Sequence, residues 1–189
     1  AWTSLFTLSA EYNRFEGSLP SSLSPNLKSL ALAHNKITLI PVEIGRLRDL
    51  VFIELQDNAL SGTLVSEIGQ IAELRVLRLS QNNLTEAIPS SFGNLKYINE
   101  LDLSENDFTG QIPSELAIPS LRILRLDSNR LTGNIPNSFA RLVGIKTLTL
   151  ENNELMGDVP SLVCQVFNLT TPVVTADCDE LGCNCCEGC

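Results

Sequence analysis

Seven asparagines recur along this chain at intervals of 22 to 24 residues. An aliphatic residue stands five positions before each asparagine, and an apolar residue stands two positions after it. A unit this short cannot bury its own apolar face, so successive units must stack and share one continuous core. The repeating asparagines are Asn13, Asn35, Asn58, Asn82, Asn106, Asn129 and Asn153.

Apolar and variable residues alternate just before each asparagine, as in Leu77-Arg78-Leu79. This period of two predicts a short strand with one buried face and one wet face. Stacking then places the strands side by side in a parallel sheet. An inward-pointing asparagine amide has two donors and one acceptor, so a column of asparagines can satisfy turn backbone that water does not reach.

The second half of each unit carries glycine and proline at fixed places. Glycine follows the asparagine by four positions in five of the seven units, and an aliphatic-proline pair follows in six. Proline suits a segment that leaves a sheet, and glycine permits positive φ or close backbone approach. Pieces such as 90–95 and 137–142 predict a Ser or Asn cap and one 3₁₀ or α turn.

These features together closely resemble the plant-type leucine-rich-repeat family, over about residues 5 to 163. The resemblance implies an α/β repeat solenoid, a right-handed horseshoe with its parallel sheet on the concave face and short turns on the convex face. Three units depart from the pattern: the unit before Pro41 is short and lacks glycine, Val65 replaces proline, and Glu86 replaces glycine. These departures leave open whether a second sheet on the flank continues through residues 36–42, 62–66 and 86–90.

Composition limits the partners of the chain. A net charge of −9 disfavours nucleic acid and anionic membranes, and no apolar run is long enough to cross a bilayer. We expect a solenoid over residues 1–163 and a cysteine-rich cap over residues 164–189. The first repeat follows Trp2 almost at once, without the usual N-terminal cap. We therefore expect upstream residues or another molecule to cover Trp2, Leu5, Phe6 and Leu8.

All six cysteines fall in the last 26 residues. A thiolate metal cluster and three disulfides are the two interpretations; we favour disulfides, which suit an open solenoid end, and predict no bound metal. The segment 173–177 predicts an eighth strand with Asp177 at the asparagine position. The terminal cluster resembles the caps of secreted algal or stramenopile repeat proteins. The cysteines are Cys164, Cys178, Cys183, Cys185, Cys186 and Cys189.

Two Asn-x-Thr sequons begin at Asn83 and Asn168. Each motif is weak alone, but with the cysteine pattern they favour an extracellular, N-glycosylated protein.

Ligand binding is expected on the wet face of the main sheet, in two columns of side chains. Charges alternate along one column, and apolar residues and one acid occupy the other. The charged column could neutralise itself, or Arg78 and Arg125 could hold a carboxylate or an acidic peptide, while Phe52 and Val76 suggest an apolar contact site. The candidate binding residues are Phe52, Glu54, Val76, Arg78, Glu100, Asp102, Ile123 and Arg125.

Catalytic chemistry finds little support. His34 is the one histidine, and no nucleophile set, phosphate loop or cofactor motif is present. We therefore predict no catalytic residues and no cofactor.

Two hypotheses for the function remain. The first is an extracellular recognition module that binds a protein, peptide or glycan. The second is a structural subunit that assembles through its solenoid ends, including self-association at the uncapped N-terminal end.

Overall fold

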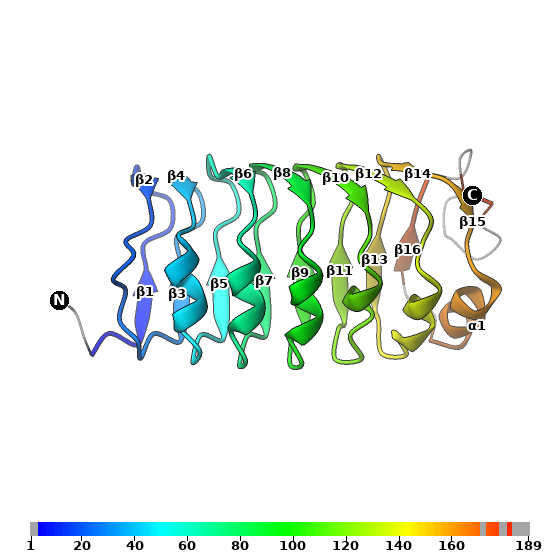
Figure 1. Cartoon of the computed structure of the whole chain (residues 1–189), viewed down its shortest axis with the longest axis horizontal. Helices are drawn as coiled ribbons and strands as arrows, with labels where there is room; N and C mark the ends of the chain where they lie inside the picture. The colour runs from blue at the N-terminus through cyan, green and yellow to red at the C-terminus, as the bar shows by residue number, and fades with distance from the viewer. Residues whose placement is uncertain (1–3, 171–172, 178–180, 183–189) are drawn as a thin grey trace.

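The computed structural model describes residues 4–170, 173–177 and 181–182. It is one repeat solenoid, with the main sheet behind a row of short helical turns (Figure 1). The main sheet has eight parallel strands, each paired with the strand of the next unit. They are β1 (Thr7–Ser9), β3 (Ser29–Ala31), β5 (Phe52–Glu54), β7 (Val76–Arg78), β9 (Glu100–Asp102), β11 (Ile123–Arg125), β13 (Thr147–Thr149) and β16 (Val173–Thr175).

The strand register confirms the predicted in-and-out alternation. Leu77 pairs with Ile53 on one side and Leu101 on the other, so the aliphatic residues of successive units form one inward column. Leu77 and Leu79 are fully buried, whereas 36% of the Arg78 side chain is exposed. The predicted repeat solenoid is confirmed, and we call the outward side of this sheet the sheet face.

Short 3₁₀ turns lie opposite the main sheet, directly after the aliphatic-proline segments. Their first residues follow Pro41, Val65, Pro89, Pro113 and Pro136, and none of these positions provides a side-chain cap. The predicted Ser or Asn caps are therefore wrong, because proline or valine occupies the cap position. The turns are η1 (Val42–Arg46), η2 (Ser66–Gln70), η3 (Ser90–Asn94), η4 (Ser114–Leu116) and η5 (Asn137–Arg141).

Serine and glycine in these turns join neighbouring units instead. The hydroxyl of Ser91 donates to the backbone oxygen of Ser66 in the preceding turn, at 2.7 Å. A Cβ on Gly69 would lie 2.4 Å from the backbone oxygen of Ser91. Glycine is needed there because successive turns pack closely.

A second set of strands follows the asparagines along one flank, at the upper edge of Figure 1. Five strands form one sheet, and β2 and β4 form a separate pair. The flank sheet is thus interrupted between β4 and β6, at the short second unit. In the third and fourth units β6 and β8 are paired, and they extend to Thr63 and Ala87 within the segments that the sequence left open. The strands are β2 (Glu16–Ser18), β4 (Lys36–Leu39), β6 (Ser61–Thr63), β8 (Asn83–Ala87), β10 (Asp107–Gln111), β12 (Arg130–Gly133) and β14 (Glu154–Leu155).

β8 has Glu86 at the position where β6 and β10 have glycine, and it still forms the flank sheet. The φ of Glu86 is +65°, in the same left-handed region as the glycines Gly62 and Gly110 at the equivalent position, both at +75°. A residue with a Cβ pays about 1–2 kcal/mol for this conformation. The pairing of β8 with both neighbours holds Glu86 there despite that cost.

The asparagine amides link each unit to the one before it. The amide nitrogen of Asn106 donates to the backbone oxygens of Leu103 and Ser104 in its own turn and of Leu79 in the preceding unit. Its oxygen accepts from the backbone N–H of Leu84, also in the preceding unit, at 3.0 Å. Asn106 is buried, so these four bonds satisfy polar groups that water does not reach.

The residue before each asparagine carries a feature that the sequence did not reveal. All seven have φ between 52° and 57°, in the left-handed region, although none is glycine. This conformation turns the chain sharply so that the asparagine side chain points inward. The seven are Tyr12, His34, Asp57, Gln81, Glu105, Ser128 and Asn152.

The C-terminal end follows the repeat in modified form. Helix α1 (Ser161–Thr170) packs against η5 and crosses the proposed boundary between residues 163 and 164. The predicted eighth strand is β16, and Asp177 accepts hydrogen bonds from the backbone N–H groups of Asn152 and Asn153, at 2.9 and 3.0 Å. Farther on, β17 (Leu181–Gly182) pairs with β15 (Gly157–Asp158).

Only part of the cysteine prediction falls on described residues. Cys164 is disulfide-bonded. The other five cysteines lie outside the described residues, as does Trp2, so the three-bridge cap stays a prediction.

Asn13 offers a matched comparison for the asparagine column. It is exposed and bonds only the backbone oxygens of its own turn, Ala10 and Glu11. We expect Asn106→Ala to lower the free energy of unfolding by on the order of 3 kcal/mol, because it orphans buried backbone groups of two units, and Asn13→Ala to cost less than about 1 kcal/mol. Urea unfolding measures both. Equal losses would contradict this account of the column.

Candidate functional site

The structure brings all eight predicted binding residues together on the sheet face. Pairing of β5, β7, β9 and β11 aligns them in two adjacent columns. The first column contains Phe52, Val76, Glu100 and Ile123. The second contains Glu54, Arg78, Asp102 and Arg125.

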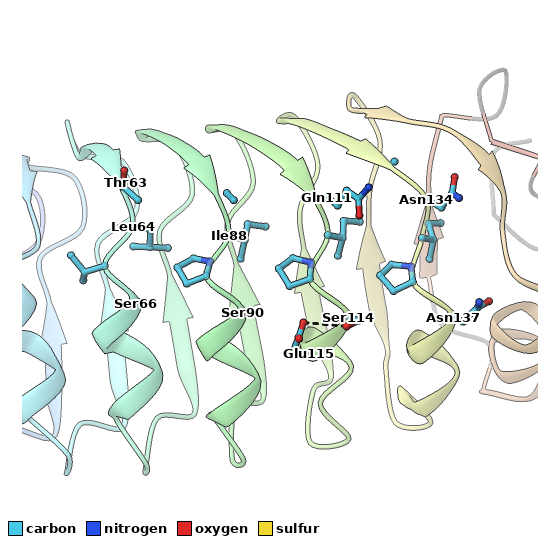
Figure 2. A pocket seen from close by; sticks show the side chains of 18 residues that line it. Thr63, Leu64, Ser66, Ile88, Ser90, Gln111, Ser114, Glu115, Asn134 and Asn137 are labelled. Atoms are coloured by element: carbon cyan, nitrogen blue, oxygen red, sulfur yellow. Dashed lines mark hydrogen bonds between the residues drawn. The ribbon is translucent and has the colours of Figure 1, made fainter.

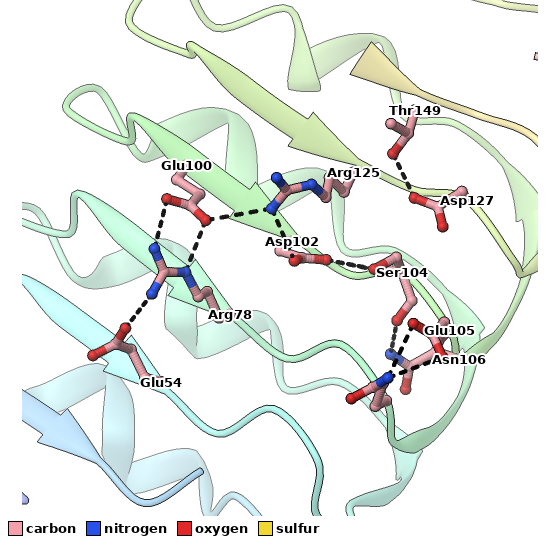
Figure 3. Close-up of polar contacts among 11 residues, drawn as sticks. Glu54, Arg78, Glu100, Asp102, Ser104, Glu105, Asn106, Arg125, Asp127 and Thr149 are labelled. Atoms are coloured by element: carbon pink, nitrogen blue, oxygen red, sulfur yellow. Dashed lines mark hydrogen bonds and ion pairs between the residues drawn. The ribbon is translucent and has the colours of Figure 1, made fainter. Parts of the chain in front are cut away.

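Arg78 is held by two acids, one from each column (Figure 3). Its Nε and one terminal nitrogen donate to the two carboxylate oxygens of Glu100, at 2.8 and 3.0 Å, and its other terminal nitrogen donates to Glu54. The bonds from Glu100 raise the pKa of Arg78 above its usual value. All three guanidinium nitrogens are therefore engaged.

Glu100 also reaches Arg125, which makes it the centre of the group. Arg125 lies 3.7 Å from Glu100 and 3.4 Å from Asp102. The sequence predicted that Arg78 would pair with its column neighbour Asp102; instead the longer Glu100 reaches it diagonally. We call Glu54, Arg78, Glu100, Asp102 and Arg125 the ionic network.

Asp102 is buried rather than outward in water, which corrects the sequence expectation. One carboxylate oxygen accepts from both the hydroxyl and the backbone N–H of Ser104, at 2.7 and 3.1 Å. Asp102 is thus fixed within its own strand end, and the other oxygen faces Arg125. Arg125, with longer contacts and 38% of its side chain exposed, is the more available of the two arginines for a ligand.

An apolar column lies beside the ionic network. Phe52 is 42% exposed, and Val76 and Ile123 are half-buried. We call these three residues the apolar column; Glu100 interrupts it between Val76 and Ile123. A rigid sheet thus presents apolar surface next to charges whose partners are already in place, which is the composition of a protein-binding patch.

Acids gather where the strands of the main sheet end. Asp127 accepts from the hydroxyl of Thr149, and Glu151 accepts from the hydroxyl of Thr175. Burial raises the pKa of Asp127, and the nearby Glu151 raises it further. This end of the sheet face, with Asp57 and Glu105 also exposed on it, favours cationic rather than anionic neighbours.

His34 belongs to a small cluster at the same end of the strands. Its Nδ1 lies 2.5 Å from a carboxylate oxygen of Asp57, and its ring stacks on Tyr12 with centroids 4.1 Å apart. Each of Tyr12, His34 and Asp57 stands directly before a repeating asparagine, so the repeat places the three in one column, although the sequence alone did not reveal their contacts. The cluster contains no nucleophile and reads as surface packing.

A groove of about 990 Å³ runs along the flank between the second sheet and the 3₁₀ turns (Figure 2). Its floor is a row of buried aliphatic residues, and prolines and small polar residues form its walls. The groove follows from repetition of the aliphatic-proline segment, and it was not anticipated from sequence. The floor residues are Leu64, Ile88, Ile112 and Ile135.

Metal-binding groups and membrane-spanning helices are both absent from the described residues. No group of three or more acidic, histidine or cysteine side chains there could hold a metal ion. None of the described helices has the length and apolar character to cross a bilayer. Asn83, the first sequon asparagine, is exposed on β8; Asn168 lies in α1, and its side chain is outside the described residues.

Comparison with known proteins agrees with this architecture. Residues 26–47, 73–95, 97–117 and 120–142 match the family described as Leucine Rich Repeat. Four of the stacked units are thus similar to leucine-rich repeats. Among curated protein sequences, none matches the chain.

Solved structures of leucine-rich-repeat proteins superimpose closely. The ectodomain of the plant membrane receptor kinase GASSHO1/SCHENGEN3 from Arabidopsis thaliana, in complex with CASPARIAN STRIP INTEGRITY FACTOR 2, is 33% identical with a TM-score of 0.88 over 96% of this chain. The Arabidopsis receptor kinase HAESA, in complex with the peptide hormone IDA and the co-receptor SERK1, is 33% identical with a TM-score of 0.83 over 96%.

A bacterial protein shares the architecture as well. A leucine-rich-repeat protein of Leptospira interrogans is 31% identical with a TM-score of 0.76 over 91% of this chain. The chain spans 22%, 31% and 42% of the lengths of these three proteins, so it corresponds to a part of each.

The raised pKa of Asp127 predicts how stability depends on pH. Because folding disfavours its charged form, Asp127 lowers stability above its folded pKa, and this loss disappears as pH falls toward the unfolded value of about 3.9. We expect Asp127→Asn to raise the melting temperature at pH 7 and to lose this advantage near pH 4. Glu16→Gln, which removes an exposed charge on β2, is the control and should change neither value. A lower melting temperature of Asp127→Asn at pH 7 would refute this reading.

Proposed function

We propose that this chain is the ligand-recognition part of an extracellular leucine-rich-repeat protein, and that a protein or peptide binds on its sheet face. The observation that carries the proposal is the apolar column beside the ionic network. Phe52, Val76 and Ile123 leave apolar surface in water on the sheet face, and binding would remove it.

The ionic network would orient such a ligand rather than supply most of its affinity. Its arginines and acids already neutralise one another, and exposed pairs contribute only about 0–1 kcal/mol each. A partner that placed an unpaired charge there would lose contacts, so the network discriminates among ligands. Arg125, with its longer contacts, is the arginine best placed to exchange partners.

Two further features support recognition outside the cell. The structural neighbours include plant receptor proteins solved with a peptide hormone. The exposed Asn83 suits glycosylation, and the disulfide-bonded Cys164 suits an oxidising compartment.

Selection from a random peptide display library tests the proposal. We expect the wild type to enrich a family of peptides, and Phe52→Ser/Val76→Ser/Ile123→Ser to bind them at least about tenfold more weakly, because apolar contact is lost. The control is Val143→Ser, which alters a residue 61% exposed outside the sheet face.

Two outcomes would count against a peptide ligand on this face. One is enrichment that the control removes as strongly as the triple variant does. The other is binding of an oligosaccharide array, with no peptides enriched, which would favour a glycan ligand instead.

Assembly through the solenoid ends is a second candidate function, favoured by the N-terminal end of the structure. A cavity of about 320 Å³ opens between the first two units, lined largely by apolar side chains. Leu5 and Leu8 are only half-buried, and Phe6 and Phe15 are 56% and 53% exposed. A second copy of the chain that covered this end would bury an apolar layer and pair the free edge of β1.

Light scattering as a function of concentration tests this assembly. We expect oligomers that Phe15→Asp abolishes and that Val143→Asp leaves intact, since only the first charge enters the apolar end. A wild-type chain that stays monomeric at about 100 times the concentration used for peptide binding would exclude the second function.

A further inference from the structure

Four cations stand in one row where the strands of the main sheet begin. Each occupies the position just before the outward residue that opens its strand. Backbone bonds run from unit to unit along this row, for example from Arg75 N–H to Val51 oxygen at 2.9 Å and from Lys146 N–H to Arg122 oxygen at 2.7 Å. We call Lys28, Arg75, Arg122 and Lys146 the leading row.

The charges of the leading row are not neutralised within the described part of the chain. Lys28, Arg75 and Lys146 are exposed, and no carboxylate among the described residues forms an ion pair with any of the four. The arginines of the ionic network, one or more columns away, differ because Glu54, Glu100 and Asp102 hold them. The leading row is therefore the part of the sheet face whose positive charges form no ion pair with a described carboxylate.

Arg122 is fixed in place. One terminal nitrogen lies within hydrogen-bond distance of the backbone oxygens of Pro119, Ser120 and Leu121, at 3.1, 3.3 and 3.0 Å. A Cβ on Gly144 would lie 2.1 Å from that same nitrogen, so glycine in the next unit leaves the space that Arg122 occupies. Its remaining nitrogens have no carboxylate partner among the described residues, so its positive charge is not paired with a carboxylate there.

The sheet face is thus polarised along its strands. Cations lie where the strands begin, where Asp49 and Glu73 are also exposed two positions earlier. Asp57, Glu105, Asp127 and Glu151 lie where the strands end, five or six residues or roughly 17–20 Å away. That distance is more than twice the screening length of about 8 Å at physiological salt. An anionic group at the leading row is therefore attracted by near cations despite the net charge of −9 of the whole chain.

We propose that the leading row binds the acidic side of an extended peptide, in which a carboxylate occupies every third position. This inference rests on the proposed function and specifies its ligand. Lys28, Arg75 and Arg122 lie at the starts of every second strand. Each is therefore about 9.6 Å from the next, measured across the strands of the sheet.

A polyproline II chain matches this spacing. It rises about 3.1 Å per residue with three residues per turn, so every third side chain points the same way at intervals of about 9.3 Å. In a β-strand, residues three apart point to opposite sides. An anionic polysaccharide fits less well, because its charges face all directions and would also meet the acidic end of the sheet face.

The probe is the synthetic peptide (Glu-Pro-Pro)₄, and its isomer with four consecutive glutamates at one end is the matched comparison. Fluorescence anisotropy at several salt concentrations measures binding of both peptides. We expect (Glu-Pro-Pro)₄ to bind about tenfold more tightly than its isomer, and its affinity to fall as the salt concentration rises. Arg75→Gln and Lys28→Gln should each weaken binding of (Glu-Pro-Pro)₄ by about two- to fivefold.

Lys96→Gln and Arg141→Gln are the controls, since these cations lie near the 3₁₀ turns, outside the sheet face. Equal binding of the two peptides, equal loss in the controls, or dextran sulfate binding that depends on the same row would each overturn the inference. Peptides from the display library distinguish binding on the sheet face in general from binding of an acidic peptide at the leading row. If they need the apolar column but not the leading row, the proposed function stands and this inference fails.

Discussion

The asparagine amide is the interaction on which the rest of the structure depends. Each interior amide bonds backbone groups of two successive units, so it closes its own turn and fixes the preceding unit at the same time. The strands then fall into register, and register is what converts residues about 24 positions apart into side-by-side neighbours. Both columns of the sheet face and the leading row exist only because this coupling repeats without slippage.

The sequence was sufficient for the fold because its information is periodic. Leu77, Arg78 and Leu79 went to the predicted sides, since alternation decides burial and nothing else competes with it. Partner choice on the surface was harder. Arg78 selects Glu100 over its column neighbour Asp102, because the longer side chain reaches diagonally while Asp102 is taken by Ser104. Backbone conformation was also hidden: Glu86 adopts a glycine-like φ that no propensity would assign to it.

Function on such a scaffold is separate from stability. The inward column must stay aliphatic, whereas outward residues can change with little effect on the core, and the same architecture therefore serves receptors with different ligands. Phe52 and the leading row are informative for that reason. Exposed apolar surface and cations without a carboxylate partner add little to folding, so their placement points to a contact outside the chain.

The interruption of the flank sheet divides the solenoid mechanically. From β6 onward, each unit is tied to the next by two sheets, one on either side of its asparagine. On the flank, β4 is instead joined to the third unit by one backbone bond without strand pairing, from Ala59 N–H to the oxygen of Ile37 at 3.0 Å. The first two units therefore form a local unit that can open at lower free energy than the body. Phe52 and the ionic network lie in the body or at its border, but Lys28 lies in the end unit. A ligand that contacts both Lys28 and the body would bind best when the first two units are folded onto the body. Such a ligand would therefore stabilise the end of the solenoid against local opening.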